Sequence, residues 1–134
     1  MNRSIQFEAR CMGKKLEVVV VDDEASITDL LESYINFLTR NAVIHTFNDS
    51  VVAQDYIRKN SIDVLITDYK MPKVNGIQLM EQTKPQTTRI MISGYVSEIA
   101  EEKLTELKAF FFEKPVPMKK LGQIITQREA MAVA

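Results

Sequence analysis

Five short runs of mostly apolar residues punctuate the chain, at residues 16–21, 42–47, 63–67, 88–92 and 109–112. Aliphatic, β-branched and aromatic residues dominate them, and each run is shorter than an ordinary helix. Near-continuous apolar runs of this length are typical of strands that are buried on both faces, as in a parallel sheet. The pattern therefore predicts five parallel strands.

Between and after these runs, apolar residues recur at the spacing of one helix face. The predicted helices begin near Ser26, Ser50, Ile77, Ser97 and Pro117. The third of them continues to Lys84, where Pro85 stops it. Leu30 belongs to the apolar face of the first helix, and the segment 110–112 is assigned chiefly to the core. Regular alternation of strand and helix predicts an α/β fold, a doubly wound five-stranded parallel sheet with helices on both faces.

Polar residues stand directly after the apolar runs. Asp22 and Asp23 follow the first run, Asp68 the third, Ser93 the fourth, and Lys114 comes just after the fifth. Parallel strands present the same end to one edge of the sheet, so these side chains are expected to converge there. The sequence thus predicts a functional site at one sheet edge.

Three carboxylates at one edge repel one another, by about 4 kcal/mol for each pair at ~4 Å and an effective dielectric constant of ~20. A hard divalent cation relieves this repulsion, and Mg²⁺ suits a site of few carboxylates and retained waters. Mn²⁺ is the second candidate. Taken alone, the segment 22–24 also fits a charge cluster at a helix N-terminus, but Asp68 and Lys114 at matching strand ends favour the site.

Composition narrows the class of protein. The chain has 134 residues, 46% hydrophobic and 26% charged, which describes one globular domain. The net charge of −1 gives no reason to expect nucleic-acid binding. Cys11 is the only cysteine, so no internal disulfide forms and a reducing compartment is expected. Neither a signal peptide nor an apolar run of ~20 residues is visible, so we predict a cytoplasmic protein without a membrane anchor.

We divide the chain into a leader or accessory segment (1–14), one domain (15–130) and a tail (131–134). Within the domain, five motifs occur in order, each at a strand end or in the loop after it. They are Val21-Asp22-Asp23-Glu24, Thr67-Asp68-Tyr69-Lys70-Met71-Pro72, Asn75-Gly76, Ile92-Ser93-Gly94-Tyr95 and Phe112-Glu113-Lys114-Pro115-Val116. Together they resemble the receiver domain of two-component response regulators over roughly residues 16–127. The resemblance implies a flavodoxin-like sheet with the strand order 2-1-3-4-5.

The resemblance also implies a metal site. Asp23 and Asp68 would be direct ligands of Mg²⁺, with Asp22 acting mainly through a bound water. The backbone carbonyl of Lys70 would complete the ligands that the protein supplies.

It further implies that Asp68 accepts a phosphoryl group as an aspartyl-phosphate. Lys114 would supply a second positive charge, and the peptide bond before Pro115 would be cis. Ser93 would donate a hydrogen bond to a phosphoryl oxygen, and Phe111 would be the aromatic residue that moves inward with that hydroxyl. The protein is thus expected to be no enzyme in the ordinary sense, but a phosphoacceptor that assists its own phosphorylation and dephosphorylation.

Lys70 and Tyr95 lie two residues after Asp68 and Ser93. In receiver domains, side chains at these places flank the path of the water that hydrolyses the phosphoryl group. A long cation and a bulky ring would obstruct that water, or the cation would form a salt bridge with the phosphoryl oxygens. We therefore predict slow self-dephosphorylation.

The implied partner is a sensor histidine kinase or a histidine phosphotransfer protein, with readout on the face of helix 4, strand 5 and helix 5. The output partner stays open, and so does a homodimer through that face. Two other functions compete: a phosphate-independent interaction module on the same fold, and a phosphohydrolase of the haloacid-dehalogenase type. Such enzymes usually place a second aspartate two residues after the nucleophile, where this chain has Lys70. His45, the lone histidine, is expected to be a partly exposed strand residue and no phosphodonor.

Overall fold

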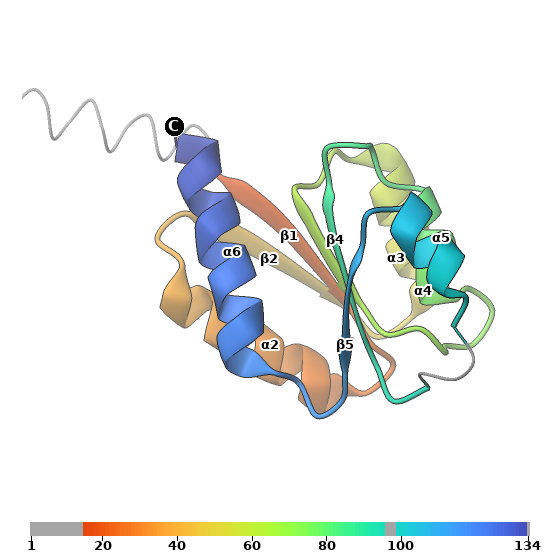
Figure 1. Cartoon of the computed structure of the whole chain (residues 1–134). Helices are drawn as coiled ribbons and strands as arrows, with labels where there is room; N and C mark the ends of the chain where they lie inside the picture. Colours follow the sequence, from red (N-terminus) through yellow and green to blue (C-terminus); the bar gives the residue numbers. More distant parts are fainter. Residues whose placement is uncertain (1–14, 96–98, 134) are drawn as a thin grey trace, which may run out of the picture.

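The computed structural model describes residues 15–95 and 99–133, and strands and helices alternate along them (Figure 1). The strands are β1 (Leu16–Val21), β2 (Ala42–Phe47), β3 (Val64–Thr67), β4 (Thr88–Ser93) and β5 (Phe110–Glu113). The helices are α2 (Ala25–Leu38), α3 (Ser50–Lys59), α4 (Gly76–Glu81), α5 (Glu101–Glu106) and α6 (Met118–Val133). The predicted leader, with Cys11, lies outside the described residues.

All strands of the sheet are parallel, in the order β2-β1-β3-β4-β5. Helices α2 and α6 cover one face, and α3, α4 and α5 cover the other (Figure 1). The doubly wound fold and the strand order are therefore confirmed. The fourth and fifth predicted helices are α5 and α6.

Alternate residues of β1 show why the strands are continuously apolar. Val18 and Val20 pack in a cluster with Leu31 of α2, whereas Val19 and Val21 pack in the other cluster with α3. All four valines are at most 1% exposed. Since both sheet faces carry a core, a polar residue at either face would be buried without a partner.

Several boundaries differ from the predictions. Helix α4 ends at Glu81 and does not reach Lys84, because Thr83 bonds back to the Met80 carbonyl and the Arg89 side chain bonds to Thr83. Ser97, the predicted start of the next helix, lies outside the described residues. Helix α5 is described from Glu101 onward. Hydrogen bonds to carbonyls three residues back, together with the Arg89 side chain, thus end α4 earlier than the apolar pattern suggests.

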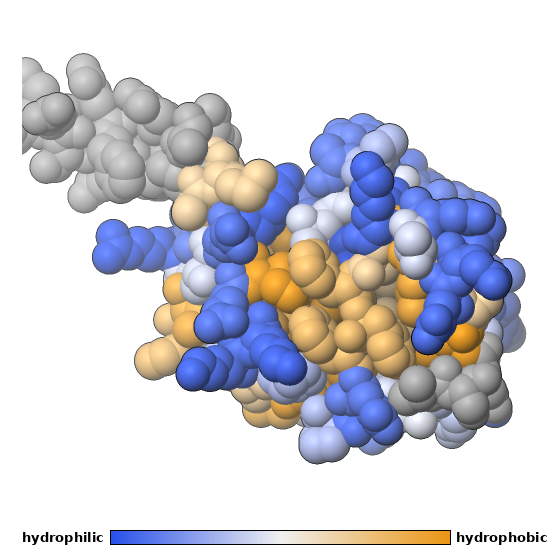
Figure 2. Space-filling view, viewed as in Figure 1, coloured by the Kyte–Doolittle hydropathy of each residue, from blue (hydrophilic) through white to orange (hydrophobic). Residues whose placement is uncertain are grey.

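Two apolar residues assigned to the core are half-exposed. Phe110 is 46% exposed because β5 is an edge strand that pairs only with β4. Figure 2 shows apolar side chains gathered over the part of the surface where β5 runs in Figure 1. Leu30 is 48% exposed and lines a surface pocket that is described below. Phe111 and Phe112 do pack against the two core clusters.

The edge at which the strands begin is held by long-range polar contacts. The Asp63 carboxylate accepts hydrogen bonds from the Glu17 backbone N–H (2.8 Å) and the Arg128 guanidinium (3.2 Å). Glu129 of α6 accepts two more, from the backbone N–H groups of Arg40 and Asn41. These contacts anchor the last turns of α6 at this edge of the sheet.

Among residues 15–95 and 99–133, no helix has the length and apolar character that crossing a bilayer requires.

Candidate functional site

Three carboxylates gather at the edge where the strands end. Ligand oxygens of Asp22, Asp23 and Asp68 lie within 4.8 Å of one another. Asp22 is 3% exposed and Asp68 is 6% exposed, while Asp23 faces solvent. The cluster thus combines two buried carboxylates with one open to solution.

The sheet itself brings these residues together. Strands β1 and β3 are neighbours, and Val21 pairs with Thr67 in their register. The pairing extends past the strand ends, since the Asp68 N–H donates to the Val21 carbonyl at 3.1 Å. Asp22 is fixed from the other side, where its N–H donates to the Phe47 carbonyl of β2 at 3.1 Å. The strand order therefore determines which acids meet.

The loop after β3 closes tightly on Asp68 and Tyr69. The Gly76 N–H donates to the Tyr69 carbonyl at 2.8 Å. A Cβ atom at Gly76 would collide with the carbonyl oxygen of Asp68, so a side chain does not fit there. Asn75 and Gln78 then form a reciprocal capping box that starts α4. The loop therefore requires glycine at position 76. The sequence had marked Gly76 only as part of a loop motif.

Lys114 is the cation of the site. Its Nζ atom lies 3.0 Å from Asp68 Oδ2 and 3.1 Å from Asp22 Oδ2, and 4.0 Å from Glu24 Oε1. The Lys114–Pro115 peptide bond is cis, as the resemblance implied. One lysine thus faces at least two buried carboxylates, which leaves a surplus of negative charge.

Burial raises the pKa of Asp22, although the Glu24 backbone N–H and Lys114 both act to lower it. Burial alone would lower the pKa of Lys114, but its hydrogen bonds to Asp68 and Asp22, with their charges, outweigh this and raise it. The ammonium therefore stays protonated. Further positive charge at the cluster would favour ionised Asp22.

These donors fit a divalent cation. Carboxylate oxygens are the preferred ligands of hard cations such as Mg²⁺, and the partly open position at Asp23 leaves room for waters. Among the described residues, Lys114 is the cation that pairs with Asp22 and Asp68, and the surplus of carboxylate charge is an electrostatic reason to bind a divalent ion.

Ser93 ends β4 at the same edge and is fully buried. Its Oγ atom accepts a hydrogen bond from the Tyr95 N–H at 3.1 Å, and its carbonyl accepts one from the Lys114 N–H at 3.0 Å. Phe111, on the neighbouring β5, is partly buried against the cluster that contains Met91. The hydroxyl and the ring thus belong to adjacent strands.

Lys70 and Tyr95 contact each other above this edge. The Lys70 Nζ atom lies 4.8 Å from the centroid of the Tyr95 ring, a cation–π distance, and both residues are exposed. Two positions singled out separately in the sequence therefore form one pair.

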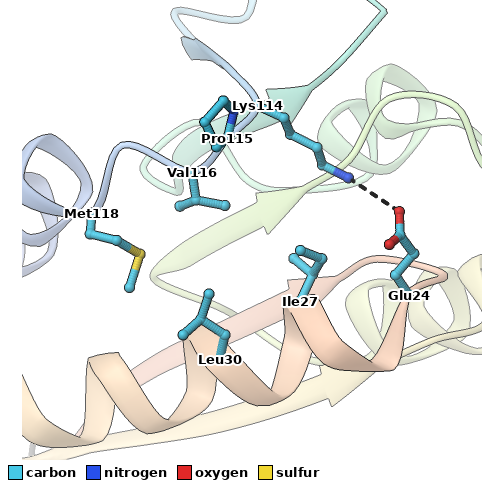
Figure 3. Close-up of a pocket in the computed structure, with 7 residues that line it drawn as sticks. All are labelled: Glu24, Ile27, Leu30, Lys114, Pro115, Val116 and Met118. Atoms are coloured by element: carbon cyan, nitrogen blue, oxygen red, sulfur yellow. Dashed lines mark ion pairs between the residues drawn. The ribbon is translucent and has the colours of Figure 1, made fainter.

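A surface pocket of about 510 Å³ adjoins the site between α2 and the start of α6 (Figure 3). Its lining consists of Glu24, Ile27, Leu30, Lys114, Pro115, Val116 and Met118. Figure 3 shows the apolar side chains along the pocket and the Lys114–Glu24 ion pair at one end. Lys114 therefore lines both the pocket and the acidic cluster.

Comparison with known proteins agrees with this geometry. The family model of the response regulator receiver domain matches residues 18–126. The chain belongs to this family. It is a response regulator receiver domain of a two-component system, and receiver domains are typically non-enzymatic phosphoacceptors.

Solved receiver domains have the same fold. One from Clostridium thermocellum is 24% identical with a TM-score of 0.74, over 87% of this chain and 95% of that one. A CheY-like receiver domain protein from Methanospirillum hungatei JF-1 is 21% identical with a TM-score of 0.72, over 88% of this chain and 96% of that one.

Longer proteins share this segment as well. A protein-glutamate methylesterase/protein-glutamine glutaminase from Ralstonia nicotianae is 32% identical over 98 residues, which are 71% of this chain and 26% of that protein. A second, from Albidiferax ferrireducens, is 40% identical over 67 residues, 50% of this chain and 18% of that protein. The chain spans about a quarter or less of the length of these relatives.

The structure brings Asp22, Asp23, Asp68 and Lys114 into one cluster, while their chemical roles stay predictions. His45 is partly exposed on β2, as expected, and its Nε2 atom lies 3.0 Å from Glu17 and 3.1 Å from the Tyr56 hydroxyl. Sequence reasoning missed two contacts made by side chains of the segment after β2. Asn48 bonds to the loop that begins at Asp22, and Ser50 bonds to the loop that begins at Asp68; we call these the two acidic loops. In the sequence, that segment was marked only by the predicted start of a helix near Ser50.

Proposed function

We propose that this receiver domain is a phosphorylation-activated signalling switch in which Asp68 accepts a phosphoryl group. The donor is a sensor histidine kinase or a histidine phosphotransfer protein. The observation that carries the proposal is the buried Asp68 carboxylate, which shares an acidic cluster with Asp22 and Asp23 and lies 3.0 Å from the Lys114 ammonium.

The cation would be held by the three aspartates of the cluster and by one backbone carbonyl. Asp23 and Asp68 would bind Mg²⁺ directly, Asp22 through a water, and the Lys70 backbone carbonyl would complete the set; Mn²⁺ fits the same donors. When bound, the ion supplies positive charge where negative charge gathers during transfer.

In the transfer itself, an Asp68 carboxylate oxygen forms a bond to phosphorus while the bond from phosphorus to the donor imidazole nitrogen breaks. The imidazole nitrogen keeps the electron pair of the broken bond. If the other ring nitrogen carries a proton, the imidazole leaves neutral; if it does not, the imidazolate takes up one proton from water. Lys114, now 3.0 Å from the carboxylate, is placed to pair with a phosphoryl oxygen. Phosphoryl transfer needs mainly positioning and charge neutralisation, and these residues supply both.

Phosphorylation would change the surface of the domain through the hydroxyl of Ser93 at the end of β4. Ser93 would turn its hydroxyl toward a phosphoryl oxygen, and the partly buried Phe111 of the next strand would follow inward. The half-exposed Phe110 lies beside it, so the surface of α5, β5 and α6 would change. An output partner, or a second copy of this chain, would bind that surface.

The phosphodonor would use the pocket between α2 and α6. Because Lys114 lines both pocket and cluster, a protein whose apolar side chains fill the pocket sits next to Asp68. The half-exposed Leu30 offers an apolar anchor there. The esterase activity named for the longer relatives is not proposed, since the matched segment is a quarter or less of those proteins.

The test is the intact mass after incubation with acetyl phosphate, with and without Mg²⁺, for the wild type and Asp68→Asn. We expect a Mg²⁺-dependent gain of one phosphoryl group that the variant lacks. If a folded wild type gains no mass and also fails to bind beryllium fluoride, rapid hydrolysis is excluded and the phosphate-independent interaction module is favoured.

A further inference from the structure

We propose that Asn48 and Ser50, in the segment between β2 and α3, are positioning residues that hold the two acidic loops at the spacing a divalent cation needs. This inference rests on the proposed function of the cluster. Neither side chain is a carboxylate, so both would act on the geometry of the ligands and not as ligands themselves.

Asn48 holds the first acidic loop. Its Nδ2 atom donates to the Asp22 carbonyl at 2.8 Å and to the Thr28 hydroxyl at 3.0 Å. The N–H of Asp22 is bonded in turn to the carbonyl of Phe47, the residue before Asn48. Both peptide groups of Asp22 are therefore fixed by two successive residues at the end of β2.

Ser50 holds the acceptor loop. Its side chain is buried at the first residue of α3, and its Oγ atom donates to the Pro72 carbonyl at 2.7 Å. Pro72 lies between Asp68 and Gly76, and the Gly76 N–H already closes the loop on Tyr69. Ser50 is thus a second anchor, halfway along that loop.

The two anchors lie two residues apart on one short segment. Asp49, between them, caps α3 by accepting a hydrogen bond from the Val51 N–H, which fixes where the helix begins. Asp22 and Asp68 repel each other, and the Lys114 ammonium between them offsets this only in part, because Asp23 adds a third carboxylate. Asn48 and Ser50 tie both loops to the same support. The cluster is therefore preorganised by a segment that contributes no ligand.

The experiment is calorimetric titration of Mg²⁺ into the wild type, Asn48→Ala and Ser50→Ala. Thr87→Val is the matched control, because the buried Thr87 hydroxyl also donates to a backbone carbonyl, that of Ile62 at 2.8 Å, but before β4 at the opposite edge of the sheet. Melting curves in excess chelator measure the loss of metal-free stability in each variant.

We expect each loop variant to bind Mg²⁺ about threefold to tenfold more weakly, below the roughly 10–100-fold lost when a direct partner of a metal ligand is removed. Thr87→Val should lose similar metal-free stability and keep the wild-type Kd. Ser50→Thr retains the hydroxyl and should restore the Kd, which a merely structural loss would not predict.

An unchanged Kd in both loop variants, at a stability loss equal to that of Thr87→Val, overturns the inference and leaves the proposed function intact. Absence of Mg²⁺ binding by the folded wild type overturns both. Because Asn48 is exposed, its variant keeps the test decisive even if Ser50→Ala does not fold.

Discussion

The two edges of the sheet use the same residue types in opposite ways. At the edge where strands begin, Asp63 is matched by the Arg128 guanidinium and a backbone N–H, and Glu129 accepts two backbone N–H groups. At the edge where strands end, the cluster of three aspartates has the ammonium of Lys114. Carboxylates that are fully matched fasten the fold. At the edge where strands end, Asp22 and Asp68 also each accept a backbone N–H. That edge differs because three carboxylates share the positive charge described beside them, that of Lys114, and the surplus negative charge is available to bind a cation.

This difference also explains why one edge has to be held in place. Paired acids attract their partners, so the contacts of Asp63 are self-stabilising. The aspartate cluster repels itself, and its spacing depends on surrounding groups such as Gly76, Asn48 and Ser50. Removing a support from the repelling edge should therefore affect function more than removing one from the paired edge.

The largest expected effect is that of Gly76→Ala. Its Cβ would collide with the backbone of Asp68, so we expect a loss of about 3 kcal/mol in the free energy of unfolding. Phosphorylation by acetyl phosphate should fall as the acceptor shifts. Urea denaturation and intact mass measure the two effects.

Gly94→Ala is the matched control at the same edge, because nothing lies within 4 Å of its Cβ position. A Gly76→Ala protein as stable as the Gly94→Ala protein would show that the acceptor loop is not closed as described.

Lys114→Met should have the next largest effect. Removing one partner of a buried ion pair costs about 3–5 kcal/mol, and because the Lys114 side chain is 22% exposed we expect about 2 kcal/mol without metal. Added Mg²⁺ should stabilise this variant more than the wild type, since it replaces the missing charge. Denaturation in chelator and in excess Mg²⁺ gives both values, and an equal gain from Mg²⁺ in the two proteins would contradict the charge surplus.

The edges should respond oppositely to loss of one acid. Asp63→Ala removes two hydrogen bonds and should cost about 1–2 kcal/mol, with or without Mg²⁺. Asp23→Ala relieves repulsion at an exposed position and should raise metal-free stability by less than about 1 kcal/mol. It should also abolish the gain from Mg²⁺. Lower metal-free stability of Asp23→Ala would mean that repulsion does not govern this edge.

The fold and the acidic residues of the site could be predicted from the sequence because local patterns mark both. Near-continuous apolar runs mark the strands, and the polar residue after each run marks the shared edge, as with Asp68 after Thr67. The distances that refine the site join distant segments, so no local pattern shows them. Asn48 bonds 26 residues away, and Gly76 excludes a side chain only because the loop returns to Asp68. Phe110 is exposed because its strand has one neighbour, which depends on strand order.

The smallest expected effect concerns the pair above the site. If the Lys70 ammonium and the Tyr95 ring together obstruct the attacking water, Tyr95→Ala should shorten the lifetime of the phosphoryl group about threefold to tenfold, since a cation–π contact contributes about 0.5–1 kcal/mol at an exposed site and the ring also fills space. Loss of phosphate after removal of acetyl phosphate measures this rate. Tyr95→Phe keeps a ring beneath Lys70 and is the control, because its lifetime should stay near that of the wild type. An Ala variant with the wild-type lifetime would show that the Lys70–Tyr95 pair does not shield the site from the attacking water.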